Sequence, residues 1–129
     1  MKLYRFDIRT THMINAHNSE RAAVSPLLNL TGDASVNAIY LGAGGKLGMH
    51  PAEKNQLFLV VSGRGWVRTA EDDEYRRVIA GHAVYWQAGE KHETMTHNGL
   101  TAIVIEGENV DPDKYMERAP LDDNNTRIW

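Results

Sequence analysis

The feature that most constrains the fold is a series of short strand-like runs between residues 35 and 106. Each run is rich in β-branched or aromatic residues, and glycine-containing or acidic turns separate it from the next. No stretch of this region keeps a helical period for three turns, so the pattern predicts an antiparallel sandwich or barrel. The predicted strands cover residues 34–41, 56–61, 65–69, 75–79, 83–86, 92–96 and 101–106.

The turns between these runs have sequence signals of their own, in glycine, asparagine and acidic residues. They fall at residues 42–45, 62–65, 71–74, 88–90 and 97–99. Residues 63–79 are predicted to form a hairpin, and its acidic loop, 71–74, is predicted to be a solvated tip.

The two ends of the chain differ from this central region. Residues 3–8 alternate well enough to predict a terminal edge strand, which pairs either within the chain or with another subunit. Asp111 followed by Pro112 predicts the start of a short helix. Residues 119–129 have little to bury, and we expect them to be either frayed or docked on a neighbour. The predicted organisation is an N-terminal strand and irregular arm (1–33), a barrel core (34–107), and a short helix and tail (108–129).

Length and charge limit the classes of partner. With 129 residues the chain fits one domain, and its formal net charge of -3 gives no basic stripe. The arginines at 64, 68, 76 and 77 are expected to be scattered rather than set on one face with aromatic residues between them. This argues against nucleic-acid binding.

The sequence has no long apolar segment and no cysteine, which limits where the protein is expected and how it could hold a metal. The longest apolar run, residues 57–61, is far short of a membrane span, and the N-terminus lacks the apolar core of a signal peptide. We therefore expect a cytoplasmic protein without a membrane partner. Because there is no cysteine, any metal must be held by His, Asp, Glu, Gln, Asn or water.

Residues 44–63 resemble the first motif of the cupins, a large family of small double-stranded β-helix barrels. That motif has the form G-x5-H-x-H-x(3,4)-E-x6-G. This sequence has Gly44, His50 and Gly63 at the matching positions. Ala52 stands where the second histidine would be, and Gln56 stands where the glutamate would be.

Residues 81–96 resemble the second cupin motif, G-x5-P-x-G-x2-H-x3-N. Gly81, Gly89 and His92 occupy matching positions, whereas Gln87 replaces the proline and Thr96 replaces the asparagine. The resemblance covers most of the chain. It implies an all-β fold, a double-stranded β-helix or jelly-roll barrel (cupin) with a short C-terminal helix.

The resemblance also implies a site for a divalent metal. In cupins three histidines and one glutamate hold the ion in a partly open octahedron. Here the implied ligands are His50, Gln56 and His92, and the implied metals are iron, manganese, nickel or zinc. The Gln56 amide brings no charge, so the affinity falls relative to a carboxylate site and an anionic ligand is favoured to complete the shell.

Strand alternation predicts which side chains share the pocket of such a site. If His92 faces inward, Thr94 and Thr96 share its face, and Gln56 shares a face with Phe58. Trp86 and Tyr40 are interpreted as barrel core or as residues at the pocket mouth. Among the acidic residues that could replace the missing glutamate, Glu106 alone lies in a strand where its carboxylate could face inward. The predicted pocket-lining residues are therefore Thr94, Thr96, Phe58, Trp86, Tyr40 and Glu106.

The remaining histidines are given other interpretations. His82 and His97 are predicted to be turn residues, with His82 exposed. His12 and His17 would reach the pocket mouth only if the N-terminal segment folded over it.

Residues 56–61 are apolar on both faces, which predicts a strand covered on both sides. A second subunit would supply the outer cover. This favours a homodimer, an assembly that cupins commonly form.

Two functions remain open on these residues. The first is a metal-assisted enzyme, an oxygenase or an isomerase/lyase, that acts on a small anionic metabolite. The second is a metal-free module that senses or stores a small-molecule ligand without chemistry, with His50 and His92 hydrogen-bonded to Gln56 and a water. There is no phosphate-binding glycine loop and no G-x-S-x-G elbow.

Overall fold

The structure is a computed structural model that describes residues 1–119. Eleven strands and three short 3₁₀ helices are present in this range. The strands are β1 (Lys2–Arg5), β2 (His12–Met13), β3 (Ala23–Val24), β4 (Ala34–Leu41), β5 (Lys46–Pro51), β6 (Asn55–Thr69), β7 (Arg76–Ile79), β8 (His82–Trp86), β9 (Lys91–Met95), β10 (Leu100–Gly107) and β11 (Glu117–Arg118). The helices are η1 (Ile8–Thr10), η2 (Ala16–Asn18) and η3 (Pro112–Lys114).

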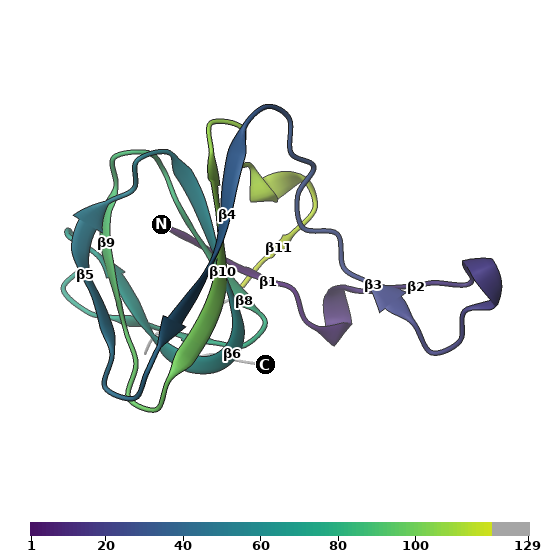
Figure 1. Cartoon of the computed structure of the whole chain (residues 1–129), viewed down its shortest axis with the longest axis horizontal. Coiled ribbons are helices and arrows are strands. Elements are labelled where there is room, and N and C mark those ends of the chain that lie inside the picture. The colour runs from purple at the N-terminus through teal and green to yellow at the C-terminus, as the bar shows by residue number, and fades with distance from the viewer. Residues whose placement is uncertain (120–129) are drawn as a thin grey trace.

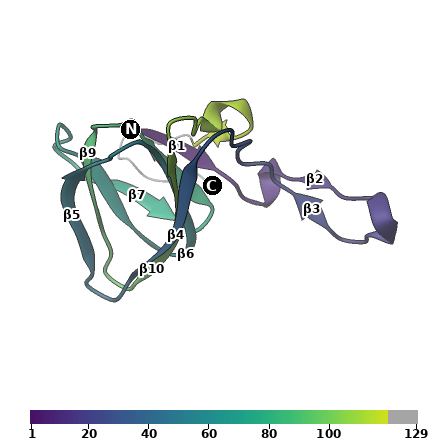
Figure 2. The same cartoon turned by 45° about the horizontal axis from the view of Figure 1, so that its top comes forward.

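Nine of these strands form one antiparallel, hydrogen-bonded barrel. One path runs in the order β11-β1-β8-β6-β10-β4, and β7 and β9 join β6 on its other half, with β5 beyond β9. The strands surround a common interior, with β5 and β9 on one side and β4 and β10 on the other (Figure 1, Figure 2). The β2–β3 ribbon extends away from the barrel as an arm.

Strand β6 holds the two halves of the barrel together. Its first half pairs with β8 and β10, and its second half pairs with β7 and β9. The prediction of a turn at residues 62–65 is wrong, because the chain bends there while it remains part of strand β6. The bend is a β-bulge: the register with β10 shifts by one residue after Val60, and Gly63 has a positive φ of 80°.

The bulge changes which side chains face the interior. Before it, Phe58 and Val60 lie in the inner core, whereas Leu57 and Leu59 belong to an outer cluster. After it, Val67 lies in the inner core, so the inward positions switch from even to odd numbers. A one-residue shift must have this effect, since successive side chains of a strand point to opposite faces.

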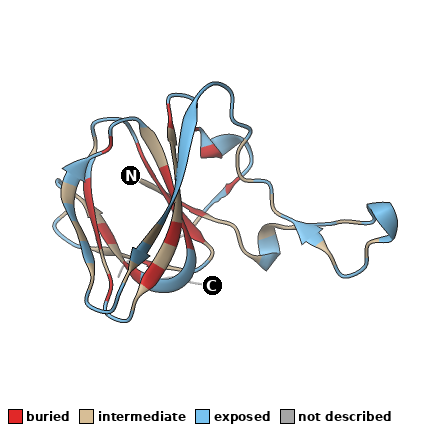
Figure 3. Cartoon of the chain, viewed as in Figure 1, coloured by how far each residue is buried: buried red, intermediate tan, exposed pale blue. Residues whose placement is uncertain are grey.

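The outer cluster is covered by the chain itself. Leu57 and Leu59 pack with Tyr4, Val110 and Met116, which come from the two ends of the chain. Their burial therefore does not require the second subunit that the sequence pattern suggested. In Figure 3 the buried residues lie along the barrel strands, whereas the β2–β3 arm is largely exposed.

The ends of the chain follow the sequence prediction in part. The N-terminal strand pairs with β8 on one side and β11 on the other, within the chain. The short C-terminal helix is η3, where the Asp111 side chain accepts a hydrogen bond from the Asp113 N–H. The prediction for residues 119–129 lies, apart from Ala119, outside the described residues.

Two local predictions are wrong. His82 is fully buried at the start of β8, where its Nδ1 accepts a hydrogen bond from the Ile79 N–H at 3.0 Å. A strand at Lys46–Pro51 was missed, because the glycines at 42, 44 and 45 before it and Gly48 within it resemble a loop.

Within residues 1–119 no helix is long and apolar enough to cross a membrane. The cytoplasmic location stays a prediction.

The bulge gives a test of the fold. A Cβ at Gly63 would lie 2.3 Å from the Gly99 carbonyl oxygen, and its φ is in the left-handed region. Gly63→Ala is expected to lower the free energy of unfolding by about 2 kcal/mol or more, and the melting temperature by roughly 5–10 °C. The control is Gly48→Ala, where a Cβ meets nothing within 4 Å. Equal melting temperatures for the two variants in thermal denaturation would contradict this account of the bend.

Candidate functional site

A small cavity of about 120 Å³ lies inside the barrel. Its walls come from six different strands, so residues distant in sequence meet there. It is lined by Ile39, Leu47, His50, Gln56, Phe58, Trp86, His92, Thr94 and Val104. The cavity is below the roughly 300–1,000 Å³ of drug-sized pockets, so a ligand within it has few non-hydrogen atoms.

The two histidines of the cavity face each other across a strand pair. His50 in β5 is the register partner of His92 in β9, and their ring centroids are 4.6 Å apart. The ring of His92 is stacked on Trp86, with centroids 3.9 Å apart and an interplanar angle of 14°. Both His92 and Trp86 are buried, so this stack fixes the orientation of the His92 imidazole.

Backbone carbonyls determine the tautomer of both rings. His50 Nδ1 lies 2.6 Å from the Gly48 carbonyl oxygen, and His92 Nδ1 lies 3.0 Å from the Glu90 carbonyl oxygen. A carbonyl oxygen only accepts, so each Nδ1 carries a proton and donates it. In its neutral form each ring therefore has its lone pair on Nε2, which is the arrangement of metal-binding histidines whose other nitrogen donates to an outer partner.

The protein environment keeps His92 neutral. Burial lowers the pKa of its imidazole below the ordinary value of 6.5, and the neighbouring His50 ring lowers it further. The hydrogen bond to the Glu90 carbonyl raises the pKa of His92, but its effect is smaller than that of burial.

Gln56 is held by Glu106. Its Nε2 donates to Glu106 Oε2 at 3.0 Å, across the directly paired positions of β6 and β10. Because a carboxylate only accepts hydrogen bonds, the Gln56 amide must turn its NH₂ group towards Glu106. Its carbonyl oxygen is then the atom available to a ligand or a metal. Glu106 follows Ala102 and Val104 on the same face of β10, and both of these pack in the inner core.

Known proteins resemble this chain in structure rather than in sequence. No family model matches the sequence, and no curated protein sequence matches it. Many solved structures do match, at probability 1.00. A cupin superfamily protein from Desulfitobacterium hafniense is 13% identical over 70% of this chain and 82% of its own, with a TM-score of 0.55. An RmlC-like cupin with a double-stranded β-helix fold from Methanocaldococcus jannaschii is 20% identical over 81% and 92%, also with a TM-score of 0.55.

The chain has the cupin fold. A chain from the crystal structures of DMSP lyases is also similar, at 24% identity over 60% of this chain and 40% of its own, with a TM-score of 0.53. Proteins with this fold thus include enzymes. This structural similarity shows the cupin barrel and not a particular activity.

The cupin fold brings together most of the residues singled out from the sequence. His50, Gln56 and His92 line one cavity, as do three of the predicted lining residues, Phe58, Trp86 and Thr94. Glu106 reaches the cavity through its hydrogen bond to Gln56.

Two predicted lining residues are elsewhere. Tyr40 is 76% exposed on the outer face of β4, because Ile39 occupies the inward phase of that strand. Thr96 is buried, but its hydroxyl donates to the Arg64 carbonyl and accepts from the Gly99 N–H, and so closes a turn.

Three apolar lining residues, Ile39, Leu47 and Val104, were not singled out from the sequence. Alternation could have identified Val104, which lies two residues before Glu106. Leu47 lies in the strand that was not predicted.

The position of the second cupin histidine is closed to a ligand. Ala52 is buried in the inner core, and a methyl group cannot coordinate a metal. Among residues 1–119 there is no group of three or more His, Cys, Asp or Glu side chains placed to hold a metal ion. A metal in the cavity would thus depend on two imidazoles and the Gln56 amide.

The lowered pKa of His92 predicts a pH dependence of stability in the metal-free protein. The unfolded chain binds a proton near the ordinary value of 6.5, whereas the folded chain binds it only at lower pH. Folding stability from this residue is therefore present above pH 6.5 and is lost as the pH falls below it.

Thermal denaturation of EDTA-treated protein between about pH 7.5 and 5.5 tests this. We expect His92→Gln to flatten the decline in melting temperature at the acidic end. The control is His17→Gln, which removes an exposed histidine of the arm. Parallel pH profiles for wild type and His92→Gln would show that the prediction is wrong.

Proposed function

We propose that the cavity binds a divalent metal ion through His50, His92 and Gln56, and that the protein acts on a small anionic metabolite there. The reaction class is that of an oxygenase or of an isomerase/lyase. One observation carries the proposal: both imidazoles donate Nδ1–H to a backbone carbonyl, which leaves both Nε2 lone pairs for the cavity.

The donor set supports an anionic ligand. All three protein donors are neutral, so they leave the charge of a divalent ion uncompensated. A carboxylate or enolate would supply the missing negative charge. Such an ion, when bound, would act as a Lewis acid towards the ligand's oxygen atoms.

The chain's own residues have separate roles in this proposal. Trp86 holds the His92 ring by stacking, and Phe58 and Val104 provide apolar walls of the cavity. The Glu106 carboxylate is the acidic group joined to the polar end of the cavity, through Gln56. We assign it the role of proton acceptor for an enolisable carbon.

A second function is supported by a different observation. Among the described residues, no third His, Cys, Asp or Glu side chain lies with His50 and His92 to complete a metal site. Without a metal, the lone pairs of His50 and His92 and the Gln56 oxygen would accept hydrogen bonds from a small ligand. The protein would then be a binding or sensing module without catalysis.

Elemental analysis of untagged protein distinguishes the two functions. We expect a first-row divalent metal near one equivalent in the wild type. His50→Ala and His92→Ala should each reduce the metal content at least about tenfold, because each removes one of three donors. His97→Ala is the matched control, since it removes an exposed histidine outside the cavity. Low metal in the wild type that does not change in either cavity variant would favour the binding module.

We also propose a homodimer, as expected from the sequence. Val36 and Tyr40 are 59% and 76% exposed on the outer face of β4, and among the described strands β4 pairs only with β10. This uncharged face continues onto Ile103 and Ile105 of β10, which are partly buried. A second copy would cover it symmetrically.

Light scattering after size-exclusion chromatography tests the dimer. The double variant Val36→Asp with Tyr40→Asp should be monomeric, because a dimer would bury two carboxylates without partners. Asn37→Asp, on the other face of the same strand, should leave the dimer intact. A monomeric wild type at about 100 μM would contradict the proposal.

A further inference from the structure

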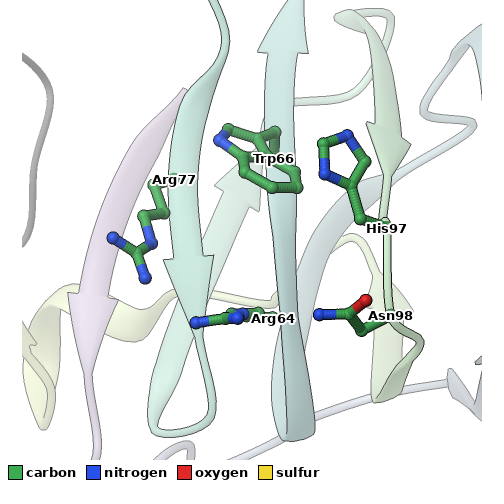
Figure 4. Close-up of a pocket in the computed structure, with 5 residues that line it drawn as sticks. All are labelled: Arg64, Trp66, Arg77, His97 and Asn98. Atoms are coloured by element: carbon green, nitrogen blue, oxygen red, sulfur yellow. The ribbon is translucent and has the colours of Figure 1, made fainter.

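A second hollow, of about 280 Å³, lies on the outside of the barrel. It is lined by Arg64, Trp66, Arg77, His97 and Asn98 (Figure 4). None of these residues lines the inner cavity. In Figure 4 the indole of Trp66 lies between Arg77 and His97, and Arg64, further along β6, lies beside Asn98.

The bulge of β6 brings these side chains to the outer face. Val67 is buried in the inner core, so its neighbour Trp66 and, two residues earlier, Arg64 face outward. Arg77 is the register partner of Trp66 in β7 and therefore shares its face. The sequence interpretation that the arginines at 64, 68, 76 and 77 are scattered, without an aromatic residue between them, is wrong for Arg64 and Arg77.

The arginines of this face differ in their partners. Arg68 is neutralised: its Nε lies 2.5 Å from Oε1 of the buried Glu93, which also accepts from the Tyr75 hydroxyl at 2.5 Å. Within residues 1–119, the side chains of Arg64 and Arg77 have neither an ion pair nor a hydrogen bond. The hollow thus has two guanidinium groups without a compensating carboxylate among the described residues.

The rest of the hollow provides a flat apolar wall and further donors. The Trp66 indole is half-buried and lies against the His97 ring, with centroids 4.5 Å apart. Asn98 adds an amide beside the arginines. An adjacent hollow of about 480 Å³ shares Arg64, Arg77 and Asn98 and continues over Ile79 and Ala80. The two guanidinium groups therefore lie in the middle of a longer groove.

We propose that this groove binds a small molecule in which an oxyanion is attached to a planar ring. The planar, fixed donors of arginine match the oxygen atoms of a phosphate or a carboxylate, and two arginines match two edges of such a group. The Trp66 indole supplies the surface against which the ring packs. This site is independent of the metal proposed for the inner cavity.

Four probes that share parts of this chemistry test the site. Phenyl phosphate and benzoate carry both parts, benzamide has the ring without the charge, and inorganic phosphate has the charge without the ring. Binding is followed by NMR at the Trp66 indole N–H, which is assigned as the signal lost in Trp66→Phe. We expect one or both aryl anions to bind and to shift this signal, and the preferred one identifies the oxyanion as phosphate or carboxylate.

Variants test the role of the arginines. Arg64→Ala and Arg77→Ala should each weaken binding of the preferred aryl anion about tenfold or more, since each removes charged hydrogen bonds. Arg64→Lys and Arg77→Lys keep the charge and the fold but lose the paired donors, and should weaken it less. Arg21→Ala, which removes the same charge from the arm, should change the affinity less than about twofold.

Several results would overturn the proposal. One is the absence of binding by both aryl anions up to about 10 mM. Another is binding that is equal in wild type, Arg64→Ala and Arg77→Ala. The ring would be irrelevant if inorganic phosphate bound as tightly as phenyl phosphate, and the effect would be one of net charge if Arg21→Ala weakened binding equally.

Discussion

The bulge in β6 after Val60 is the constraint on which both faces of the barrel depend. It lets one strand pair with β8 and β10 in its first half and with β7 and β9 in its second. It also shifts the inward phase by one residue. Gln56 and Phe58 therefore face the inner cavity, whereas Trp66 faces the outer groove. Gly63 is needed here because a side chain would collide with the Gly99 carbonyl.

The inner cavity holds neutral imidazoles and the outer groove holds charged guanidinium groups, and this difference has a physical reason. Inside the barrel, burial makes a charged imidazole costly, so His92 is held neutral and its proton is fixed by a backbone carbonyl. On the outer face, water solvates charge, so Arg64 can stay charged without a carboxylate partner among the described residues. Arg68 differs because it contacts the buried carboxylate of Glu93, which needs a positive partner.

Much of the fold could be predicted because alternation and turn residues act locally. The strand at 34–41 has the predicted bounds, and the hairpin of β6 and β7 forms around the acidic loop. Errors arose where a local signal has two meanings. Glycine at 63 signals a turn or a bulge, and apolar residues at 39 and 40 leave the phase of β4 undetermined. His82 lies beside a turn glycine, yet the pairing of β8 buries it.

By itself, the sequence determined an antiparallel β-structure, because strand alternation and turn residues are properties of neighbouring residues. Its resemblance to the two cupin motifs added the type of barrel and the expectation that His50, Gln56 and His92 belong to one site. Only the tertiary structure decided that Glu106 holds Gln56, that the chain's own ends cover Leu57 and Leu59, and that two arginines flank Trp66. These contacts join residues far apart in the chain. They depend on the order of the strands and on a one-residue bulge. Hydrogen bonds between strands fix both of these features, and no local sequence pattern specifies them.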